Sequence, residues 1–287
     1  MPLFGRSDGD LIRALPLVRR IMPYLMRGRN ESVVYHEAMY LVAPARAWLD
    51  AFNAARPDAP PATLFHLFLY GCARALHERP GLNRFVSGGH VYQRREVALS
   101  FAAKRAFQDD APIVTCKVAF PKEESFAAGI ARLTGSVREG RSGKELAVDK
   151  ELKLTFLLPS AVIGWGVRLL MWLDRHNLMP SAMIKPDPMF ASLFAANLGS
   201  VGIDDVTHHL YEYGNVSLFG AMGKAGPHLV VGDDGQPAVK DAVKVRWSFD
   251  ERINDGFYCA ASLGLVRELM EDPEKVLGAP EAAAKAG

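Results

Sequence analysis

Residues 246–256 read Arg-Trp-Ser-Phe-Asp-Glu-Arg-Ile-Asn-Asp-Gly, and the rest of the chain is interpreted from this stretch. Trp247 and Phe249 alternate with polar neighbours, which predicts a strand, and residues 253–256 turn the chain into a helical pattern at Phe257–Met270. A strand that brings charged side chains into a turn before a helix is a common way to present catalytic groups. Because the same pattern closes many ordinary strand–helix units, it indicates a candidate site only.

The composition is that of a globular chain of 287 residues, with 49% hydrophobic residues and a formal net charge of +2. A net charge this small gives no electrostatic argument for nucleic acid or for an anionic membrane surface, although short basic clusters occur at Arg19-Arg20 and Arg27–Arg29. The three cysteines lie far apart in apolar segments, which predicts buried free thiols. The N-terminus lacks the apolar core of a signal peptide, so a cytoplasmic location is expected.

The hydrophobic periodicity predicts alternating strands and helices in a single domain, 1–287, with frayed ends. Gly88-Gly89 predicts the turn of a hairpin between Phe85 and Tyr92. Leu11–Met26 has helical spacing interrupted by two prolines, while the pattern of Glu145–Leu152 predicts neither state. We expect strands at Val33–Leu41, Val97–Ala103, Ile113–Ala119, Phe190–Leu198, Val216–Met222 and Val239–Lys244, and helices at Pro44–Ala54, Thr63–Leu76 and Ser125–Arg138.

One apolar run, Phe156–Leu173, is nearly long enough to span a membrane. It contains Arg168 and is followed by Asp174, and a spanning helix would have to bury the arginine in lipid. A half-buried helix or a lid is therefore the leading interpretation, and an interfacial membrane contact is the alternative.

Three separated passages resemble the dihydrolipoamide acyltransferases of the 2-oxo acid dehydrogenase complexes. Residues 249–256 resemble the Asp-His-Arg-x-x-Asp/Asn-Gly signature of that family, and residues 192–199 resemble its Phe-Thr-Ile-Ser-Asn-Leu-Gly segment. Residues 75–85 resemble its passage of a helix, Pro-x-Leu-Asn and a strand. The resemblance runs from about residue 12 to residue 275. It implies the α/β fold of chloramphenicol acetyltransferase, a two-layer sandwich with a mixed β-sheet covered by helices.

The resemblance also implies partners and substrates. It implies a homotrimer, with the possibility of a larger cage, because the family builds its active sites between subunits. Coenzyme A or an acyl-coenzyme A is then a substrate, and no metal is expected. No lipoyl or subunit-binding domain precedes the fold in this sequence, so we expect no lipoyl group on this chain.

Two positions depart from the family and make its usual reaction doubtful here. The general-base histidine is replaced by Glu251, and the oxyanion-stabilising serine by Ala196, which has no donor. Imidazole accepts a proton near pH 7, whereas a glutamate carboxyl has a pKa of about 4.3 in model peptides and matches a thiol or an alcohol poorly unless burial raises it.

The remaining candidates come from the same passages. His208 and His209 could replace the base, and adjacent histidines in a strand would point to opposite faces. The resemblance gives Asp255 an arginine partner near the chain start, chosen from Arg19, Arg20, Arg27 and Arg29. The candidate catalytic residues are therefore Glu251, Asp255, His208 and His209, and the candidate coenzyme-binding residues are Ser192, Asn197 and Gly199.

Three functions follow from these observations. The first is acyl transfer from acyl-coenzyme A to an unknown acceptor with altered catalytic residues. The second is a catalytically silent trimeric scaffold or acyl-coenzyme A-binding pseudoenzyme. The third is a binding module that contacts a membrane or a long acyl chain through Phe156–Leu173; nucleic acid is not expected as a partner.

Overall fold

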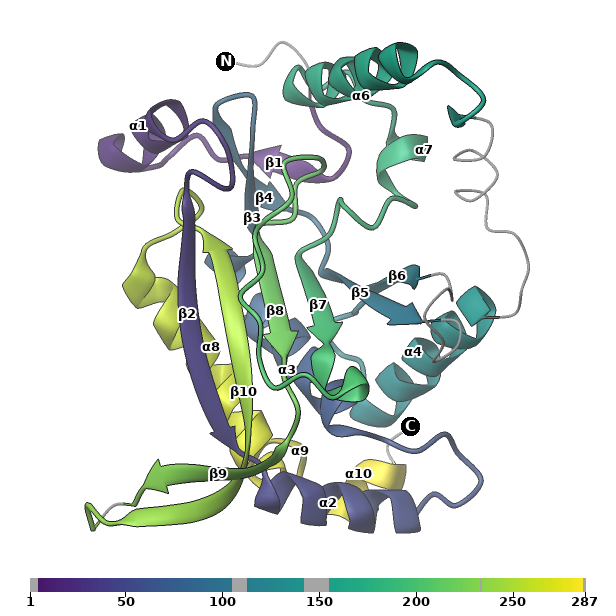
Figure 1. Ribbon diagram of the computed structural model, residues 1–287, viewed down its shortest axis with the longest axis vertical. Coiled ribbons are helices and arrows are strands. Elements are labelled where there is room, and N and C mark those ends of the chain that lie inside the picture. The colour runs from purple at the N-terminus through teal and green to yellow at the C-terminus, as the bar shows by residue number, and fades with distance from the viewer. Residues whose placement is uncertain (1–4, 105–112, 142–154, 233, 286–287) are drawn as a thin grey trace.

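A large mixed sheet forms the centre of the computed structural model, which describes residues 5–104, 113–141, 155–232 and 234–285 (Figure 1). Its strands follow the order β2-β10-β8-β7-β5-β6, and β9 pairs with the first half of β10. The β5–β7 and β7–β8 pairs are parallel and the others antiparallel. The strands are β2 (Val33–Leu41), β5 (Ala98–Lys104), β6 (Ile113–Ala119), β7 (Leu193–Asn197), β8 (Leu218–Met222), β9 (Gly226–Val231) and β10 (Pro237–Asp250).

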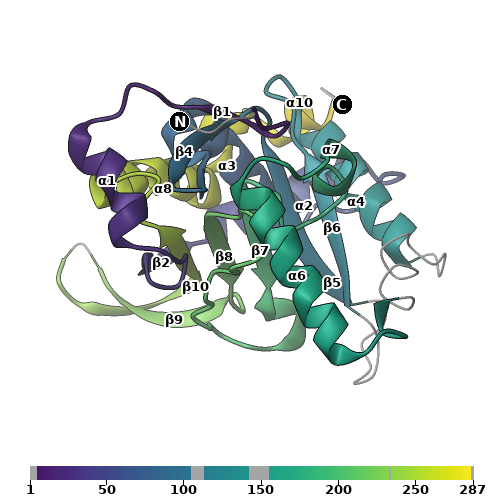
Figure 2. The ribbon, with the colours of Figure 1, turned by 90° about the horizontal axis from the view of Figure 1, so that it is seen from above.

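Helices cover one face of this sheet, and most of the hydrophobic core lies between the two layers (Figures 1 and 2). Trp247 and Phe249 of β10 enter this core, since alternate residues of a strand share a face. The opposite face carries a smaller cluster around Phe194 and Phe219, whose rings stack at 5.4 Å. The covering helices are α2 (Ala43–Ala54), α3 (Leu64–Glu78), α4 (Phe126–Arg141) and α8 (Gly256–Glu271).

A second, three-stranded sheet lies above the first and has the order β1-β4-β3. Gly88 and Gly89 turn the chain from β3 into β4 with φ of 56° and 78°, a left-handed conformation that favours glycine. Two short helical elements flank this sheet, α1 (Leu17–Leu25) and the 3-10 turn η1 (Pro80–Leu82). The strands are β1 (Gly9–Leu11), β3 (Arg84–Ser87) and β4 (His90–Arg94).

The remaining elements lie at the two ends of the molecule (Figure 1). Helices α6 (Ser160–Arg175) and α7 (Ser181–Ile184) lie at the same end as α1, and the 3-10 turn η2 (Leu198–Val201) follows β7 at the other. Helices α9 (Pro273–Leu277) and α10 (Pro280–Lys285) close the chain. The tail expected to fray is thus helical: Trp48 Nε1 donates to Gly278 O at 3.0 Å, and Ala283 is buried.

The predicted elements largely agree with these bounds, and the differences have local causes. The predicted helix at Leu11–Met26 begins only at Leu17, because Pro16 precedes the first turn and Leu11 pairs with β4. Cys72, Cys116 and Cys259 are free and buried, as predicted. Residues 145–152 lie outside the described part of the chain.

Candidate active site

The turn after β10 is held by an ion pair that is almost fully buried. Asp250 Oδ2 and Arg252 Nη2 lie 2.7 Å apart, with exposed side-chain fractions of 0% and 3%. Asp250 Oδ1 accepts from Ser32 Oγ at 2.9 Å and from the Arg252 N–H at 3.0 Å. Arg252 Nη1 donates to Met26 O at 2.9 Å, which ties this turn to the end of α1. The pair is structural, since its hydrogen-bonding groups are used within the fold.

Asp255 also holds the backbone in place. Its side chain accepts from the Tyr258 N–H at 2.7 Å and so caps α8. Arg19 Nη2 lies 3.7 Å from Asp255 Oδ2, and Arg19 Nη1 donates to Glu251 O at 2.9 Å. Of the four arginines considered from the sequence, Arg19 is the partner of Asp255.

Glu251 differs from its neighbours because only its backbone is engaged. Its N–H donates to Ser32 O at 2.9 Å, and its carbonyl oxygen accepts from Arg19. Within the described part of the chain, no side chain or N–H group pairs with the Glu251 carboxylate, which is half-buried. This carboxylate is therefore left available to a ligand.

His208 and His209 lie in a loop over the uncovered face of the sheet, and their rings stack at 4.8 Å. The expectation of opposite faces is therefore wrong, because this segment is not a strand. The His208 ring stacks on Phe219 at 4.0 Å, and His208 Nδ1 donates to His209 O at 2.6 Å. A carbonyl oxygen only accepts, so Nδ1 carries the proton and Nε2 of the neutral ring is a free acceptor. Burial lowers the pKa of His208 from its ordinary value, which favours the neutral ring.

The turn after β7 is held by hydrogen bonds of its own residues. Asn197 Oδ1 accepts from the Ser200 N–H at 3.3 Å, and Ser200 Oγ donates to Asn197 O at 2.7 Å. Gly199 approaches the backbone of the next strand connection so closely that a Cβ would lie 2.7 Å from Gly223 O. Asn197 and Gly199 thus shape the turn that presents Ala196.

An apolar pocket of about 600 Å³ opens beside this turn. This volume is that of a small-molecule site. Its lining comes from the loop before α3, from α3, β5 and α4, and from the turn after β7. The lining residues include Pro60, Pro61, Thr63, Phe65, His66, Leu69, Phe101, Ala102, Leu133, Thr134, Val137, Ala196, Asn197, Leu198, Ser200 and Val201.

His66 is a titratable side chain in the lining of this pocket that sequence reasoning did not consider. Its Nδ1 accepts from the Thr63 N–H at 3.2 Å, so the proton of the neutral ring lies on Nε2. Burial lowers the pKa of His66 to about 4, so the ring is neutral at pH 7 and presents an N–H donor. The signal in the sequence was the capping spacing Thr63-x-x-His66, in which a histidine takes the usual place of Glu or Gln.

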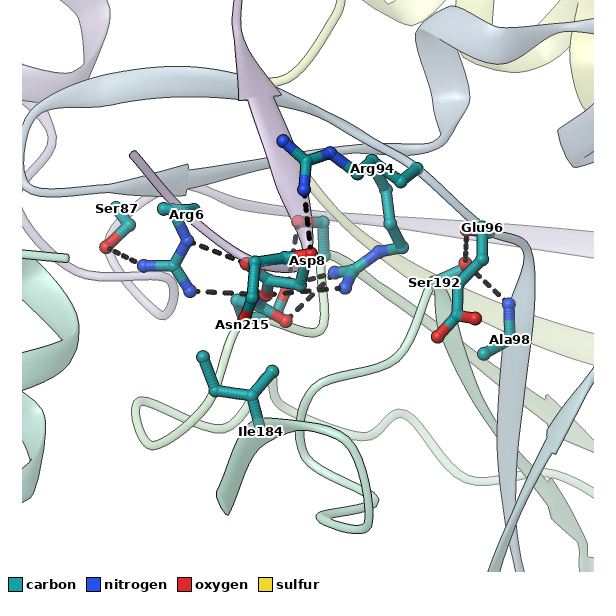
Figure 3. Close-up of polar contacts among 12 residues, drawn as sticks. Arg6, Asp8, Ser87, Arg94, Glu96, Ala98, Ile184, Ser192 and Asn215 are labelled. Carbon is teal, nitrogen blue, oxygen red and sulfur yellow. Dashed lines mark hydrogen bonds and ion pairs between the residues drawn. The ribbon is translucent and has the colours of Figure 1, made fainter. Parts of the chain in front are cut away.

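Ser192 lies apart from this pocket, directly before β7 and beside the start of β5 (Figure 3). Its Oγ accepts from the Ala98 N–H at 3.1 Å and donates to Glu96 O at 3.5 Å. Because the hydroxyl is buried and used in this way, it is not available to a coenzyme.

The two turns lie at opposite ends of the sheet (Figure 1). Ala196 pairs with Ala221, and Ala221 with Arg246, five positions before Glu251. At about 3.3 Å per residue and 4.8 Å per strand, Ala196 and Glu251 are about 20 Å apart. One copy of the chain therefore does not bring the two candidate halves of the site together.

The comparisons with known proteins agree with these observations. Residues 184–278, which include both turns, match the family described as 2-oxoacid dehydrogenases acyltransferase (catalytic domain). This third of the chain is similar to that family. The chain is 26% identical over 211 residues to the lipoamide acyltransferase component of the branched-chain alpha-keto acid dehydrogenase complex of Bacillus subtilis (strain 168), covering 73% of this chain. The matched region spans about two fifths (39%) of that protein's length.

Solved structures of acyltransferases show the same fold. The cubic core of the pyruvate dehydrogenase multienzyme complex is similar with a TM-score of 0.61 and 17% identity, covering 96% of this chain and 100% of that one. The dihydrolipoamide acetyltransferase of Azotobacter vinelandii gives 0.58 and 17%, with the same coverage. A probable dihydrolipoamide acetyltransferase of Listeria monocytogenes 4b F2365 gives 0.55 and 17%, with 92% and 96% covered. The predicted mixed α/β fold of the acyltransferases is confirmed.

In the described residues, no group of three or more His, Cys, Asp or Glu side chains is placed to hold a metal ion. None of the helices in the described ranges combines the length and the apolar character needed to cross a membrane.

Proposed function

We propose that this acyltransferase relative transfers an acyl group from an acyl-coenzyme A to an acceptor at a site formed between two copies of the chain. The observation that carries the proposal is the separation of about 20 Å between Ala196 and Glu251 in one copy. An oligomer that places the Glu251 turn of one subunit against the Asn197 turn of the next would complete the site. We propose a homotrimer, and the likeness to a cubic core supports the possibility of a larger cage.

The residues of this chain could carry the acyl-transfer step. The apolar pocket beside Ala196 would receive the thioester end of the donor. A base removes the proton from the acceptor as the acceptor attacks the thioester carbonyl carbon, and the coenzyme A thiolate leaves and takes that proton back. The His66 Nε2–H group can donate to the oxyanion in place of the absent serine hydroxyl. Glu251 and the Nε2 atom of His208 are the two candidate bases.

One solved relative supports the placement of the altered residues. The Azotobacter vinelandii structure concerns the role of a serine, a histidine and an asparagine in the catalytic mechanism, with the last two four positions apart. Glu251 and Asp255 have the same spacing here. This likeness supports the assignment of Glu251 to the chemistry and of Asp255 to the support of its turn.

A silent, acyl-coenzyme A-binding trimeric scaffold is the second candidate. The observation in its favour is that Ala196 carries no donor and that Glu251 replaces an imidazole base. A carboxylate beside a developing oxyanion opposes its formation. In this case the pocket would still bind the thioester without turnover.

The location and the other contacts complete the proposal. We propose a cytoplasmic protein without a nucleic-acid partner. No residue of the apolar segment Phe156–Leu173 lines the pocket beside Ala196, so an acyl chain in that pocket would not reach it directly. This supports a contact of the segment with a surface outside the protein.

Calorimetric titration with coenzyme A, acetyl-coenzyme A and palmitoyl-coenzyme A is the first test. Saturable binding near one site per subunit is expected, and Leu133→Trp, which fills the pocket, should abolish it. Leu229→Trp on β9, outside the pocket, is the matched control. Absence of binding of every thioester would contradict both the acyltransferase and the acyl-coenzyme A-binding scaffold.

Acyl transfer between acyl-coenzyme A and free dihydrolipoamide shows whether Glu251 or a histidine is the base. Glu251→Gln should abolish exchange if Glu251 is the base, and His208→Ala or His209→Ala should do so if a histidine is. If wild type binds thioesters but supports no exchange, the silent scaffold is supported. Exchange that survives all three changes would exclude both assignments.

A mixed-oligomer experiment tests the shared site. Two variants are unfolded and refolded together in equal amounts. One carries only the base substitution that abolishes exchange, and the other carries only Leu133→Trp. If each site takes one half from each of two subunits, random mixing should restore about a quarter of wild-type exchange. Activity that stays at the level of the single variants would place the whole site in one subunit.

A further inference from the structure

Helix α6 and the segment before it expose an unusual set of large apolar side chains. Trp165 and Trp172 are 65% and 50% exposed, whereas Trp48 and Trp247, the other two tryptophans, are buried. Phe156, Leu157, Leu158, Val162, Val167 and Leu169 are also exposed.

The helix is nevertheless fixed to the body of the protein. Leu170 and Leu173 pack on a small buried cluster that includes Ile184 and Phe190. Asp174 Oδ1 lies 2.7 Å from Arg6 Nη2, and both side chains are mostly buried. The exposed apolar side chains are therefore held on a rigid element.

Helix α1 presents a second apolar surface at the same end of the molecule (Figures 1 and 2). Its exposed large apolar residues are Leu17, Val18, Ile21, Tyr24 and Leu25. The tip of the β3–β4 hairpin joins α1 to α6. A Cβ on Gly89 would lie 3.0 Å from the Tyr24 ring, and one on Gly88 would lie 2.2 Å from Arg175 O. The two helices and this tip form one surface, which we name the α1–α6 face.

The exposed charges of the two segments that form the α1–α6 face are positive, although Glu31 and Glu212 accept from the Arg27 and Arg29 N–H groups at the end of α1. Residues 11–30 include no Asp or Glu, and residues 155–186 include only Asp174, which is buried against Arg6. The exposed cations of these two segments are Arg13, Arg20, Arg27, Arg168, Arg175 and Lys185. The net charge of +2 conceals this local excess, so it was a poor guide to this surface.

We propose that the α1–α6 face docks onto the surface of a bilayer that contains anionic phospholipid. Tryptophan side chains favour the interface between lipid and water, and flanking arginines attract anionic headgroups. Both helices lie in the interfacial plane, since none in the described chain is suited to cross the membrane. A second copy of this face fits less well, because a two-fold contact would set these six cations against the same six.

The proposal is independent of acyl transfer and is tested by flotation of the full chain with vesicles. Vesicles of phosphatidylcholine with one quarter phosphatidylglycerol should bind the protein, and vesicles of phosphatidylcholine alone should bind it at least tenfold less. Tryptophan emission should shift to shorter wavelength on binding, because two of the four tryptophans lie on this face.

Two sets of variants separate the apolar and electrostatic parts. Trp165→Glu with Trp172→Glu should reduce binding at least tenfold, and Arg168→Gln with Arg175→Gln should weaken binding and its dependence on salt. Leu229→Glu with Val239→Glu, exposed apolar residues of β9 and β10, is the matched control and should bind as wild type does. Circular dichroism and the Trp48 and Trp247 emission verify folding.

Three results would overturn the proposal. The first is wild-type protein that does not float with either vesicle. The second is equal binding by the tryptophan variant and wild type. The third is wild-type protein that self-associates and does not bind vesicles, together with a tryptophan variant that no longer self-associates. That result would make the face a contact between copies of the chain.

Discussion

The turn after β10 and the turn after β7 differ in what their side chains do. In the first, Asp250, Arg252 and Asp255 all hold the backbone, whereas the Glu251 side chain has no hydrogen-bond partner among the described residues. In the second, Asn197 and Gly199 shape the turn, and Ala196 borders a pocket.

The comparison shows where resemblance to a family is informative. In both turns the residues that resemble the family signature fix the backbone, and the residue that departs from the signature either borders a pocket (Ala196) or has a side chain without a polar partner among the described residues (Glu251). Likeness at these positions therefore predicts the fold better than it predicts the reaction.

The largest expected effect is at the buried ion pair. Asp250→Ala should destabilise the protein by about 3–5 kcal/mol, since it leaves the Arg252 guanidinium buried without its partner. Urea unfolding followed by tryptophan emission measures the change. Asp10→Ala, which breaks an exposed pair with Arg95, is the control and should leave the midpoint unchanged. A small loss for Asp250→Ala would mean that the first turn is not held by this pair.

The pH dependence of stability tests the pocket beside Ala196. Burial lowers the pKa of His66 to about 4, so between about pH 4 and 6.5 the unfolded chain binds a proton that the folded chain does not. Stability should therefore fall as pH decreases through this window, by up to about 3 kcal/mol. His66→Gln keeps an acceptor for the Thr63 N–H and should remove this part of the pH dependence. Identical pH profiles for variant and wild type would show that His66 is accessible to protons in the fold.

Close packing behind the second turn gives a smaller effect. Gly199→Ala should cost about 1–3 kcal/mol, because its Cβ would meet Gly223 O at 2.7 Å. Gly135→Ala in α4, where a Cβ would meet nothing within 4 Å, should instead stabilise by up to about 1 kcal/mol. If both variants shift the urea midpoint in the same direction, the turn is more adaptable than the comparison implies.

The smallest expected effect is at Asp255, where two substitutions distinguish the helix-capping hydrogen bond from the ion pair with Arg19. Asp255→Ala should cost about 1 kcal/mol through loss of the α8 cap. Asp255→Asn keeps an acceptor for the Tyr258 N–H and loses only the charge towards Arg19, so its urea midpoint should lie near that of wild type. A cost for Asn equal to that for Ala would assign the role to the ion pair.

Much of the fold could be predicted from the sequence, because periodicity reports burial. Trp247 and Phe249 of β10 follow the period of 2, and the buried residues of α8 follow the period of 3.6. The site could be predicted only in part. The role of Ser192 depends on its neighbour strand, and the stacking of His208 on Phe219 depends on a loop path that no local pattern encodes. His66 was missed because its pocket collects residues from four distant segments.

The contact between Arg6 and Asp174 joins residues 168 positions apart in the chain. Contacts of such long sequence separation form late in folding, after local helices and hairpins. Helix α6 would therefore form, with its apolar side chains exposed to solvent, before the contact between Arg6 and Asp174 holds it to the protein. Such a folding intermediate is prone to aggregation. Removal of the first eight residues should therefore lower the yield of refolding more than it lowers the stability of the folded protein.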